Sequence, residues 1–157
     1  MKAKEMMDKD FIYVNADDSI EDISIKMENI KRFTTPVLDE NMKLIGWITS
    51  LDITKGLREN KKLISEVMSL KKDVKYIYED DPSRLAVLEA SRSKLICIPV
   101  FNHDDVVTGL IYSLEIVDIL SKLYDIKIEK IYRAIDKYSK EITWNELMEA
   151  SSIIYRK

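Results

Sequence analysis

The sequence predicts a mixed α/β (α+β) fold in which one small unit occurs twice and is followed by helices. Three observations predict this fold: an internal repeat without gaps, the same alternation of short apolar and amphipathic segments in both copies, and helical periodicity after the repeat. Of the 157 residues, 46% are hydrophobic and 34% are charged, a balance typical of globular chains and not of disordered ones.

The repeat superposes residues 11–54 on residues 74–117 at a constant offset of 63. The chain has only three glycines and three prolines, and two of each coincide at this offset, so that chance is a poor explanation. The coinciding residues include the pairs Pro36 and Pro99, Gly46 and Gly109, and Asp52 and Glu115.

The first copy is expected to form strand, helix, strand, strand and helix. Asp18 and Ser19 are favourable N-cap residues for its first helix, and the spacing from Asp18 to Glu21 is that of a capping box. Ser50 is expected to cap the second helix, which should end near Asn60. The expected elements are a strand at 11–14, a helix with Ile20, Ile23, Met27 and Ile30 on its apolar face, strands at 34–38 and 43–49, and a helix from residue 50.

The second copy repeats this order. Asp81 is expected at the N-cap of its first helix and Pro82 at the first helical position, where proline is favoured. The expected elements are a strand at 75–78, a helix with Leu85, Ala86 and Leu88 facing inward, strands at 95–101 and 106–112, and a helix from Ser113 to about Tyr124. Because a unit of about 50 residues buries little core alone, the copies should pack face to face, related by a pseudo-twofold axis, with two equivalent clefts between them.

We divide the chain into a first unit at residues 1–60, a second unit at 61–123 and a helical extension at 124–157. The extension has an apolar stripe at helical spacing over residues 128–138, and a capping box that begins at Thr143. These helices are expected to cover the module or to complete a dimer interface. The alternative is that they relay the state of the module to a protein partner.

Composition and motifs exclude several classes of function. No apolar run is long enough to span a bilayer and the first residues lack the apolar core of a signal peptide, so a cytoplasmic location is the default expectation. A net charge of −3 without a basic stripe argues against nucleic acid as a partner. Cys97 is expected to be a small buried residue and His103 an exposed turn residue, which leaves too few ligands for a zinc site. The absence of phosphate-loop, GxSxG and HExxH motifs argues against an enzyme.

The two copies resemble a pair of CBS domains, also called a Bateman module, over about residues 1–123. The residues that carry the resemblance are Pro36-Val37 with the stretch from Gly46 to Asp52, and Pro99-Val100 with the stretch from Gly109 to Glu115. The resemblance implies tandem β-α-β-β-α units that act as a regulatory, ligand-sensing module and associate as a homodimer, with no catalytic residue, metal or further cofactor. The implied ligand is an adenosine-containing molecule, AMP, ADP, ATP or S-adenosylmethionine, bound between the repeats.

The residues of the first copy suggest how such a ligand is held. Thr49 lies where a strand meets a helix, and helix N-termini offer free N–H groups and a partial positive charge that suit a phosphate. We therefore expect the Thr49 hydroxyl and the Ser50 N–H to hold phosphate oxygens, Asp52 to accept the ribose hydroxyls, and Arg32 to supply positive charge. The alternative is that Ser50 and Asp52 only stabilise the helix start. The resemblance implies that the residues flanking the adenine are Thr34, Thr35, Pro36, Asn15 and Ala16.

The second copy departs from this pattern, since Tyr112 replaces the small hydroxyl residue and Glu115 replaces the aspartate. A tyrosine ring would intrude where a phosphate should lie. We therefore expect one working nucleotide site, and a second site that is degenerate, empty or adapted to another ligand. The second site consists of Ile98, Pro99, Tyr112, Ser113 and Glu115. The alternative function is a protein-interaction or dimerisation module whose ligand clefts are vestigial.

Overall fold

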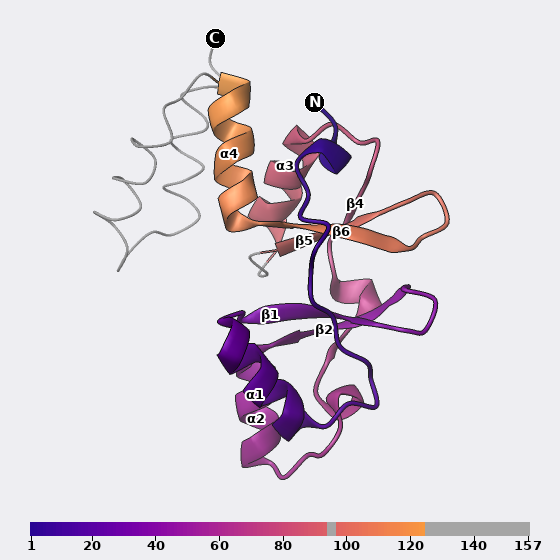
Figure 1. The fold of residues 1–157 in the computed structure, drawn as a ribbon, viewed down its shortest axis with the longest axis vertical. Coiled ribbons are helices and arrows are strands. Elements are labelled where there is room, and N and C mark those ends of the chain that lie inside the picture. The colour runs from indigo at the N-terminus through magenta and orange to yellow at the C-terminus, as the bar shows by residue number, and fades with distance from the viewer. Residues whose placement is uncertain (94–96, 125–157) are drawn as a thin grey trace, which may run out of the picture.

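The computed structural model describes residues 1–93 and 97–124, which form two lobes joined at a waist (Figure 1). In each lobe, two helices lie on the outer side of a small three-stranded sheet, and the two sheets face each other across the waist. No described helix combines the length and the apolar character that crossing a bilayer requires. The helices predicted for residues 125–157 lie outside the described residues.

The first lobe consists of α1 (Ile20–Ile30), β1 (Thr34–Leu38), β2 (Leu44–Thr49), α2 (Ser50–Arg58), a 3-10 turn η2 (Ile64–Glu66) and β3 (Ser69–Leu70). Its sheet is antiparallel, in the order β1-β2-β3. β1 and β2 form the predicted hairpin, in which Thr34 pairs with Thr49 and Val37 with Gly46.

The second lobe consists of β4 (Ile77–Tyr78), α3 (Arg84–Arg92), β5 (Cys97–Phe101), β6 (Val107–Tyr112) and α4 (Ser113–Tyr124). Two further 3-10 turns are η1 (Ala3–Glu5) and η3 (Lys71–Asp73). In the sheet, β4 runs parallel to β5, and β5 pairs with β6 antiparallel. Cys97 pairs with Tyr112 and Val100 with Gly109, which is the register of the first hairpin shifted by the repeat offset. The register therefore repeats residue for residue, as the ungapped repeat predicts.

The first helix of each copy begins later than the predicted caps, Asp18 and Asp81, would place it. Asp18 and Asp81 do not cap a helix, because their carboxylates accept the backbone N–H groups of Asn15 and Tyr78, each at 2.8 Å, and so close the preceding turn. The predicted capping box at Asp18 and the predicted cap at Asp81 are therefore wrong. The residues at the N-cap are Ser19 in α1, which was the second predicted candidate, and Ser83 in α3.

Other element boundaries also differ from the prediction. Residues 11–14 form no strand, since only Val14 makes an isolated bridge, to Val37 of β1, and the strand expected at 75–78 is shortened to β4. The helix α2 is capped by Thr49 and not by Ser50, because the Thr49 side chain accepts the N–H of the third helical residue. Two residues predicted to face inward are 38% exposed, namely Ile30 and Leu88.

The segments that precede the two repeats are exchanged between the lobes. Ala3 and Met6 precede the first repeat, yet they belong to the apolar core of the second lobe. Asp8 continues this association, since its backbone N–H and carbonyl both bond to Leu110 of β6. In return, Ile64 precedes the second repeat and belongs to the core of the first lobe. The segment before the first repeat therefore completes the second lobe, and the segment before the second repeat completes the first lobe. The division of the chain at residues 60 and 123 stays a prediction from sequence.

The exchanged segments explain the repeated glycines. A Cβ atom at Gly46 would lie 2.6 Å from Met68 Sδ and 2.6 Å from the Ser69 carbonyl oxygen. A Cβ atom at Gly109 would meet the side chain of Met7. Neither glycine has a positive φ, so the close approach of the exchanged methionine, and not the backbone conformation, requires glycine at these two positions.

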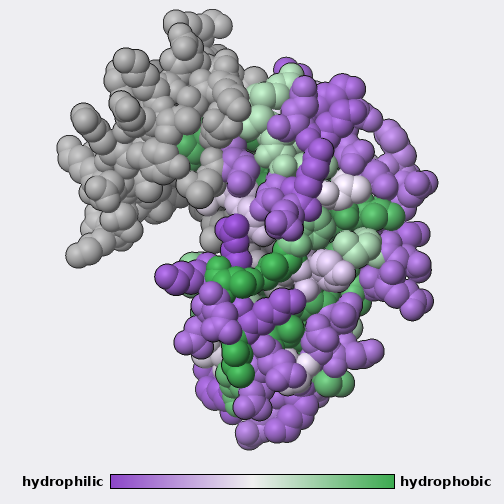
Figure 2. Space-filling view, in the orientation of Figure 1, coloured by the Kyte–Doolittle hydropathy of each residue, from purple (hydrophilic) through white to green (hydrophobic). Residues whose placement is uncertain are grey.

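An apolar cluster shared by both lobes fills the waist. Figure 2 shows apolar residues along the waist, between lobes whose surfaces are largely polar. Cys97 belongs to this cluster, and burial raises the pKa of its thiol well above the usual value, so that the expected role as a buried apolar residue is confirmed. The cluster includes Leu38, Leu44 and Trp47 from the first lobe and Phe101, Leu110 and Tyr112 from the second.

An exposed ion-pair cluster fastens the N-terminal segment to the second lobe. Asp80 Oδ1 accepts from the ammonium groups of Lys2 (2.9 Å) and Lys4 (3.0 Å). Asp80 Oδ2 lies 3.1 Å from Nε2 of His103, whose side chain is otherwise exposed, as predicted. The hydrogen bonds from Lys2, Lys4 and His103 hold the pKa of Asp80 well below its usual value.

We expect Gly46→Ala to destabilise the fold more than Gly109→Ala. The methyl group added at Gly46 meets a backbone oxygen at 2.6 Å, whereas at Gly109 it meets only the Met7 side chain, whose Sδ and Cγ can move aside although its Cβ, at 2.9 Å, cannot. Overpacking of this kind costs about 1–3 kcal/mol. Urea unfolding followed by circular dichroism measures both variants, and Gly109→Ala combined with Met7→Ala should lose less than the sum of the two single changes. A Gly46→Ala variant as stable as the wild type would contradict this account.

The lowered pKa of Asp80 predicts a loss of stability in acid. A carboxylate with a lower pKa in the folded chain stabilises the fold above its unfolded pKa, and this contribution disappears as the pH falls toward the folded value. The difference in melting temperature between the wild type and Asp80→Asn should therefore shrink between about pH 5 and about pH 2 in calorimetry. Asp17→Asn, at the equivalent exposed position of the first repeat, is the matched control. A difference that is independent of pH would show that the carboxylate is not coupled to folding.

Candidate functional site

The predicted phosphate and ribose residues of the first copy bind each other. Thr49 is both the last residue of β2 and the N-cap of α2. The Thr49 backbone N–H and hydroxyl both donate to Asp52 Oδ2, each at 2.9 Å, and Thr49 Oγ1 accepts from the Asp52 N–H at 3.3 Å. Within the described residues, Asp52 Oδ1 takes part in no hydrogen bond. The pair therefore forms a capping box, as the alternative interpretation of the sequence has it, and keeps one carboxylate oxygen available.

Ser50 has a different environment from the one expected. Its N–H donates to the carbonyl oxygen of Phe33 at 2.9 Å, because the pairing of the chain before β1 continues past the end of β2. The Ser50 N–H that was expected to hold a phosphate is therefore bonded to the backbone, and the candidate ligand contact of this residue is its side chain. The Ser50 side chain itself is exposed.

The residues expected around the adenine lie on two neighbouring segments. Thr34 and Thr35 are buried in β1, where Thr34 accepts a hydrogen bond from the Trp47 indole and Thr35 donates to the carbonyl oxygen of Ile12 (3.1 Å). The third β1 residue, Pro36, is buried as well. All three residues are therefore buried within the sheet, and Thr34 pairs directly with Thr49 on the neighbouring strand.

Asn15 and Ala16 follow the bridge between Val14 and β1. Asn15 is exposed, and its backbone N–H and carbonyl are both used in the turn closed by Asp18. The carbonyl of Ala16 accepts from the Ser65 N–H at 2.9 Å, which ties this segment to the exchanged turn η2. Only the Asn15 side chain is therefore free to contact a ligand without disturbing the turn.

A groove of about 470 Å³ lies between α1 and α2, a feature the sequence did not predict. Two of the predicted site residues, Ser50 and Arg32, line this groove, together with the apolar Met27, Phe33 and Leu57. Two apolar residues outside the predicted inward faces, Phe33 and Leu57, are the sequence feature that could have indicated this groove. They are 65% and 49% exposed.

The second copy repeats one hydrogen bond of the capping box of Thr49 and Asp52 with different side chains. The Tyr112 N–H donates to Glu115 Oε2 at 2.9 Å, which is the equivalent of the bond between Thr49 and Asp52. Ser113 is exposed at the start of α4. Ile98 and Pro99 are buried in β5, at the positions equivalent to Thr35 and Pro36.

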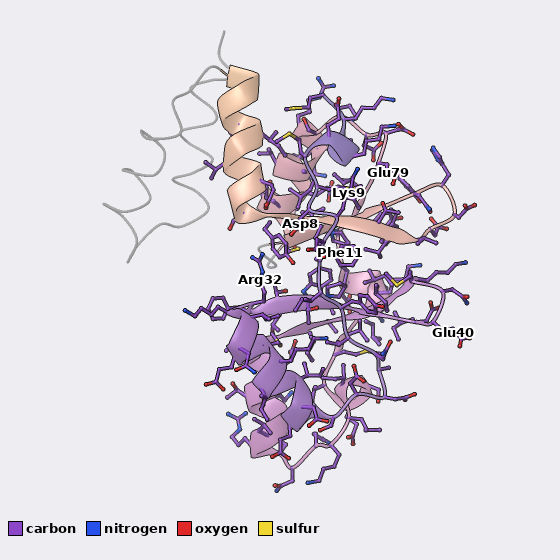
Figure 3. The ribbon with its side chains drawn as sticks, in the orientation of Figure 1. Asp8, Lys9, Phe11, Arg32, Glu40 and Glu79 are labelled. Carbon is purple, nitrogen blue, oxygen red and sulfur yellow. The ribbon has the colours of Figure 1, made fainter. Side chains whose placement is uncertain are left out.

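Tyr112 is buried at the waist and is covered by a residue from the other lobe. Its side chain belongs to the shared cluster, and burial raises the pKa of Tyr112 to about 12. The guanidinium carbon of Arg32 lies 4.3 Å above the centre of the ring. Figure 3 shows Arg32 pointing from the first lobe into the waist. The structure thus brings Arg32, which the sequence analysis assigned to the site of Thr49, onto the central residue of the second site.

The fold and site define a class of protein, a tandem pair of small α+β units, each with a β-hairpin between two helices, that face each other through their sheets. The CBS domain profile matches residues 3–59. A CBS domain-containing protein of Methanocaldococcus jannaschii, MJ0729, is 33% identical over 76% of this chain and 93% of that protein. The chain belongs to the CBS domain family.

Two solved structures extend this comparison. The uncharacterized protein MJ1004 of the same organism is 35% identical, and its crystal structure matches with a TM-score of 0.70 over 98% of this chain and 76% of that chain. The CBS domain pair of protein MJ0100, crystallised in complex with 5′-methylthioadenosine and S-adenosyl-L-methionine, is 29% identical, with a TM-score of 0.67 over 76% of this chain and 99% of that chain. The expected family and fold are therefore confirmed.

Proposed function

We propose that this chain is a regulatory module that binds an adenosine-containing ligand in a cleft between the repeats, at the junction of β2 and α2. The observation that carries the proposal is that Asp52 caps α2 through Oδ2 and, among the described residues, keeps Oδ1 available at this junction, where Thr49 lies directly across from Thr34. The complexes of the CBS pair of MJ0100 with 5′-methylthioadenosine and S-adenosyl-L-methionine support the class of ligand. The proposed binding residues are Thr49, Ser50, Asp52, Thr34, Thr35, Pro36, Asn15 and Ala16.

The chemistry of the junction suits a nucleoside. A carboxylate can accept charge-assisted hydrogen bonds from both hydroxyls of a ribose. Asp52 can offer Oδ1 for this purpose while Oδ2 keeps its helix-capping hydrogen bonds. The start of α2 carries a partial positive charge, and the Thr49 hydroxyl can turn from Asp52 toward an oxygen of the ligand. AMP, ADP, ATP, S-adenosylmethionine and 5′-methylthioadenosine share the adenosine that this arrangement would recognise.

We propose a regulatory and not a catalytic role, in which the bound ligand changes the angle between the lobes. Only a ligand with different affinity for two arrangements of the lobes can shift their populations. The extension at 124–157 follows α4 directly and is proposed to carry the change to a protein partner. A cytoplasmic location is proposed because these ligands are metabolites of the cytoplasm.

A protein-interaction module with vestigial clefts is the second candidate function. It is favoured by the exposed apolar side chains on α1 and α2 and on the segment between α1 and β1, and by a capping box in which Thr49 and Asp52 already satisfy each other. The same apolar side chains support the proposal that the chain forms a homodimer through this face. The residues are Ile25, Phe33, Leu51 and Leu57.

Calorimetric titration with the five adenosine ligands separates the two functions. We expect at least one ligand to bind, and Asp52→Ala to weaken it by about 1–3 kcal/mol through the loss of charged hydrogen bonds. Glu115→Ala removes the equivalent capping carboxylate from the second copy, and this matched control should leave the affinity unchanged. If none of the ligands binds, the interaction module is favoured. If Asp52→Ala and Glu115→Ala behave alike, the assignment of the site is wrong.

The homodimer predicts a selective effect of charge on the helical face. Leu57→Glu should shift the chain from dimer to monomer in sedimentation velocity, because the charge would be buried against the partner. Leu70→Glu, at a leucine of β3 that is equally exposed (50% against 49%), should leave the dimer intact. A monomeric wild type, or equal effects of both changes, would contradict the interface.

A further inference from the structure

We infer that Tyr112 and Arg32 together close the second cleft to phosphate, and that Arg32 is a specificity-determining residue of this cleft and not of the first. The inference rests on the proposed function, because it concerns which of the two clefts can accept the phosphate of a nucleotide. The contact between Arg32 and Tyr112 would then contribute to the difference between the two clefts.

The first step is the place that the Tyr112 ring fills. Tyr112 is the repeat equivalent of Thr49, and its backbone is held in the same way, by the side chain of the acid three residues later. The ring is 7% exposed and packs in the shared cluster of the waist. A large side chain therefore lies where the first copy has a hydroxyl group at the entrance of the helix.

The second step is the path of Arg32 across the waist. Lys31 ends α1 in a left-handed conformation (φ 56°), which turns the chain away from the helix immediately before Arg32. The Arg32 side chain leaves its own lobe, and its guanidinium carbon lies 4.3 Å from the centre of the Tyr112 ring (Figure 3). A guanidinium over an aromatic face is attracted by the electron density of the ring.

The third step is the charge around this contact. The Glu115 carboxylate accepts a hydrogen bond from the Tyr112 N–H, and the backbone of Asp8 is bonded to the backbone of Leu110 on the same strand. Both carboxylates raise the pKa of Tyr112, after burial as the largest cause, and Arg32 lowers it, so all three charges act on this one ring. Arg32 is therefore engaged with the ring and is not available to a phosphate in the second cleft, and the negative charges of Asp8 and Glu115 that act on the same ring disfavour an anion there.

Replacing the ring tests this directly, since Tyr112→Thr gives the second cleft the hydroxyl of the first. AMP, which carries a phosphate, and 5′-methylthioadenosine, which does not, are titrated calorimetrically into five chains. These are the wild type, Tyr112→Thr, Arg32→Ala and the double variant, with Arg58→Ala as the control for loss of an exposed arginine in the same lobe. We expect the number of AMP sites per chain to rise by one in Tyr112→Thr. The new site should bind AMP at least tenfold more weakly in the double variant, while Arg58→Ala should behave like the wild type.

The single change Arg32→Ala tests the inference even if Tyr112→Thr does not fold. We expect the affinity of the first cleft for AMP to stay within twofold of the wild type. A tenfold loss of AMP affinity without a loss for 5′-methylthioadenosine would place Arg32 on the phosphate of the first cleft and overturn the inference. A folded Tyr112→Thr chain with no additional site would also overturn it. A wild type that binds none of the five adenosine ligands would instead remove the proposed function, and with it this inference.

Discussion

The packing of the two sheets across the waist is the interaction on which the rest of the structure depends. Each sheet has three strands, and one strand in each is only two residues long, so each lobe by itself buries only a small core. Trp47 from one lobe and Leu110 from the other are both fully buried in the cluster they share. Because this cluster holds the lobes face to face, side chains at the edge of one lobe reach residues of the other, as Arg32 reaches Tyr112.

The exchanged segments make the lobes dependent on each other in a second way. Gly109 of β6 lies against Met7, from the segment that precedes the first repeat, and Gly46 of β2 lies against Met68, from the segment that precedes the second repeat. A ligand that changes the angle between the lobes must therefore move these segments as well, and the first of them is also held by the ion pairs of Asp80. This coupling is the physical route by which a small change in a cleft would reach the rest of the chain.

The two copies place an acid with the same structural role three residues after a strand, next to different side chains. Asp52 and Glu115 both bind the backbone of the residue at the helix entrance. In the first copy that residue is Thr49, which leaves space and a hydroxyl group, and in the second it is Tyr112, which fills the space. The repeat and the unlike side chains were both readable in the sequence. The hydrogen bonds of Ser50 and the position of Arg32 were not, because both depend on which segments the fold brings together.

The sequence by itself determined the duplication, the order of helices and hairpin strands in each copy and the equivalence of the two hairpin registers, because these follow from local patterns and from the constant offset of the repeat. It did not determine where the first helix of each copy starts, since the side chain of Asp18 or Asp81 can cap a helix or close a turn with similar local chemistry. The tertiary structure decided this, and it also decided that the N-terminal segments change lobes and that Arg32 lies on Tyr112. The reason is that these contacts join residues far apart in the chain, and their free energy comes from burial between the lobes and not from local propensity.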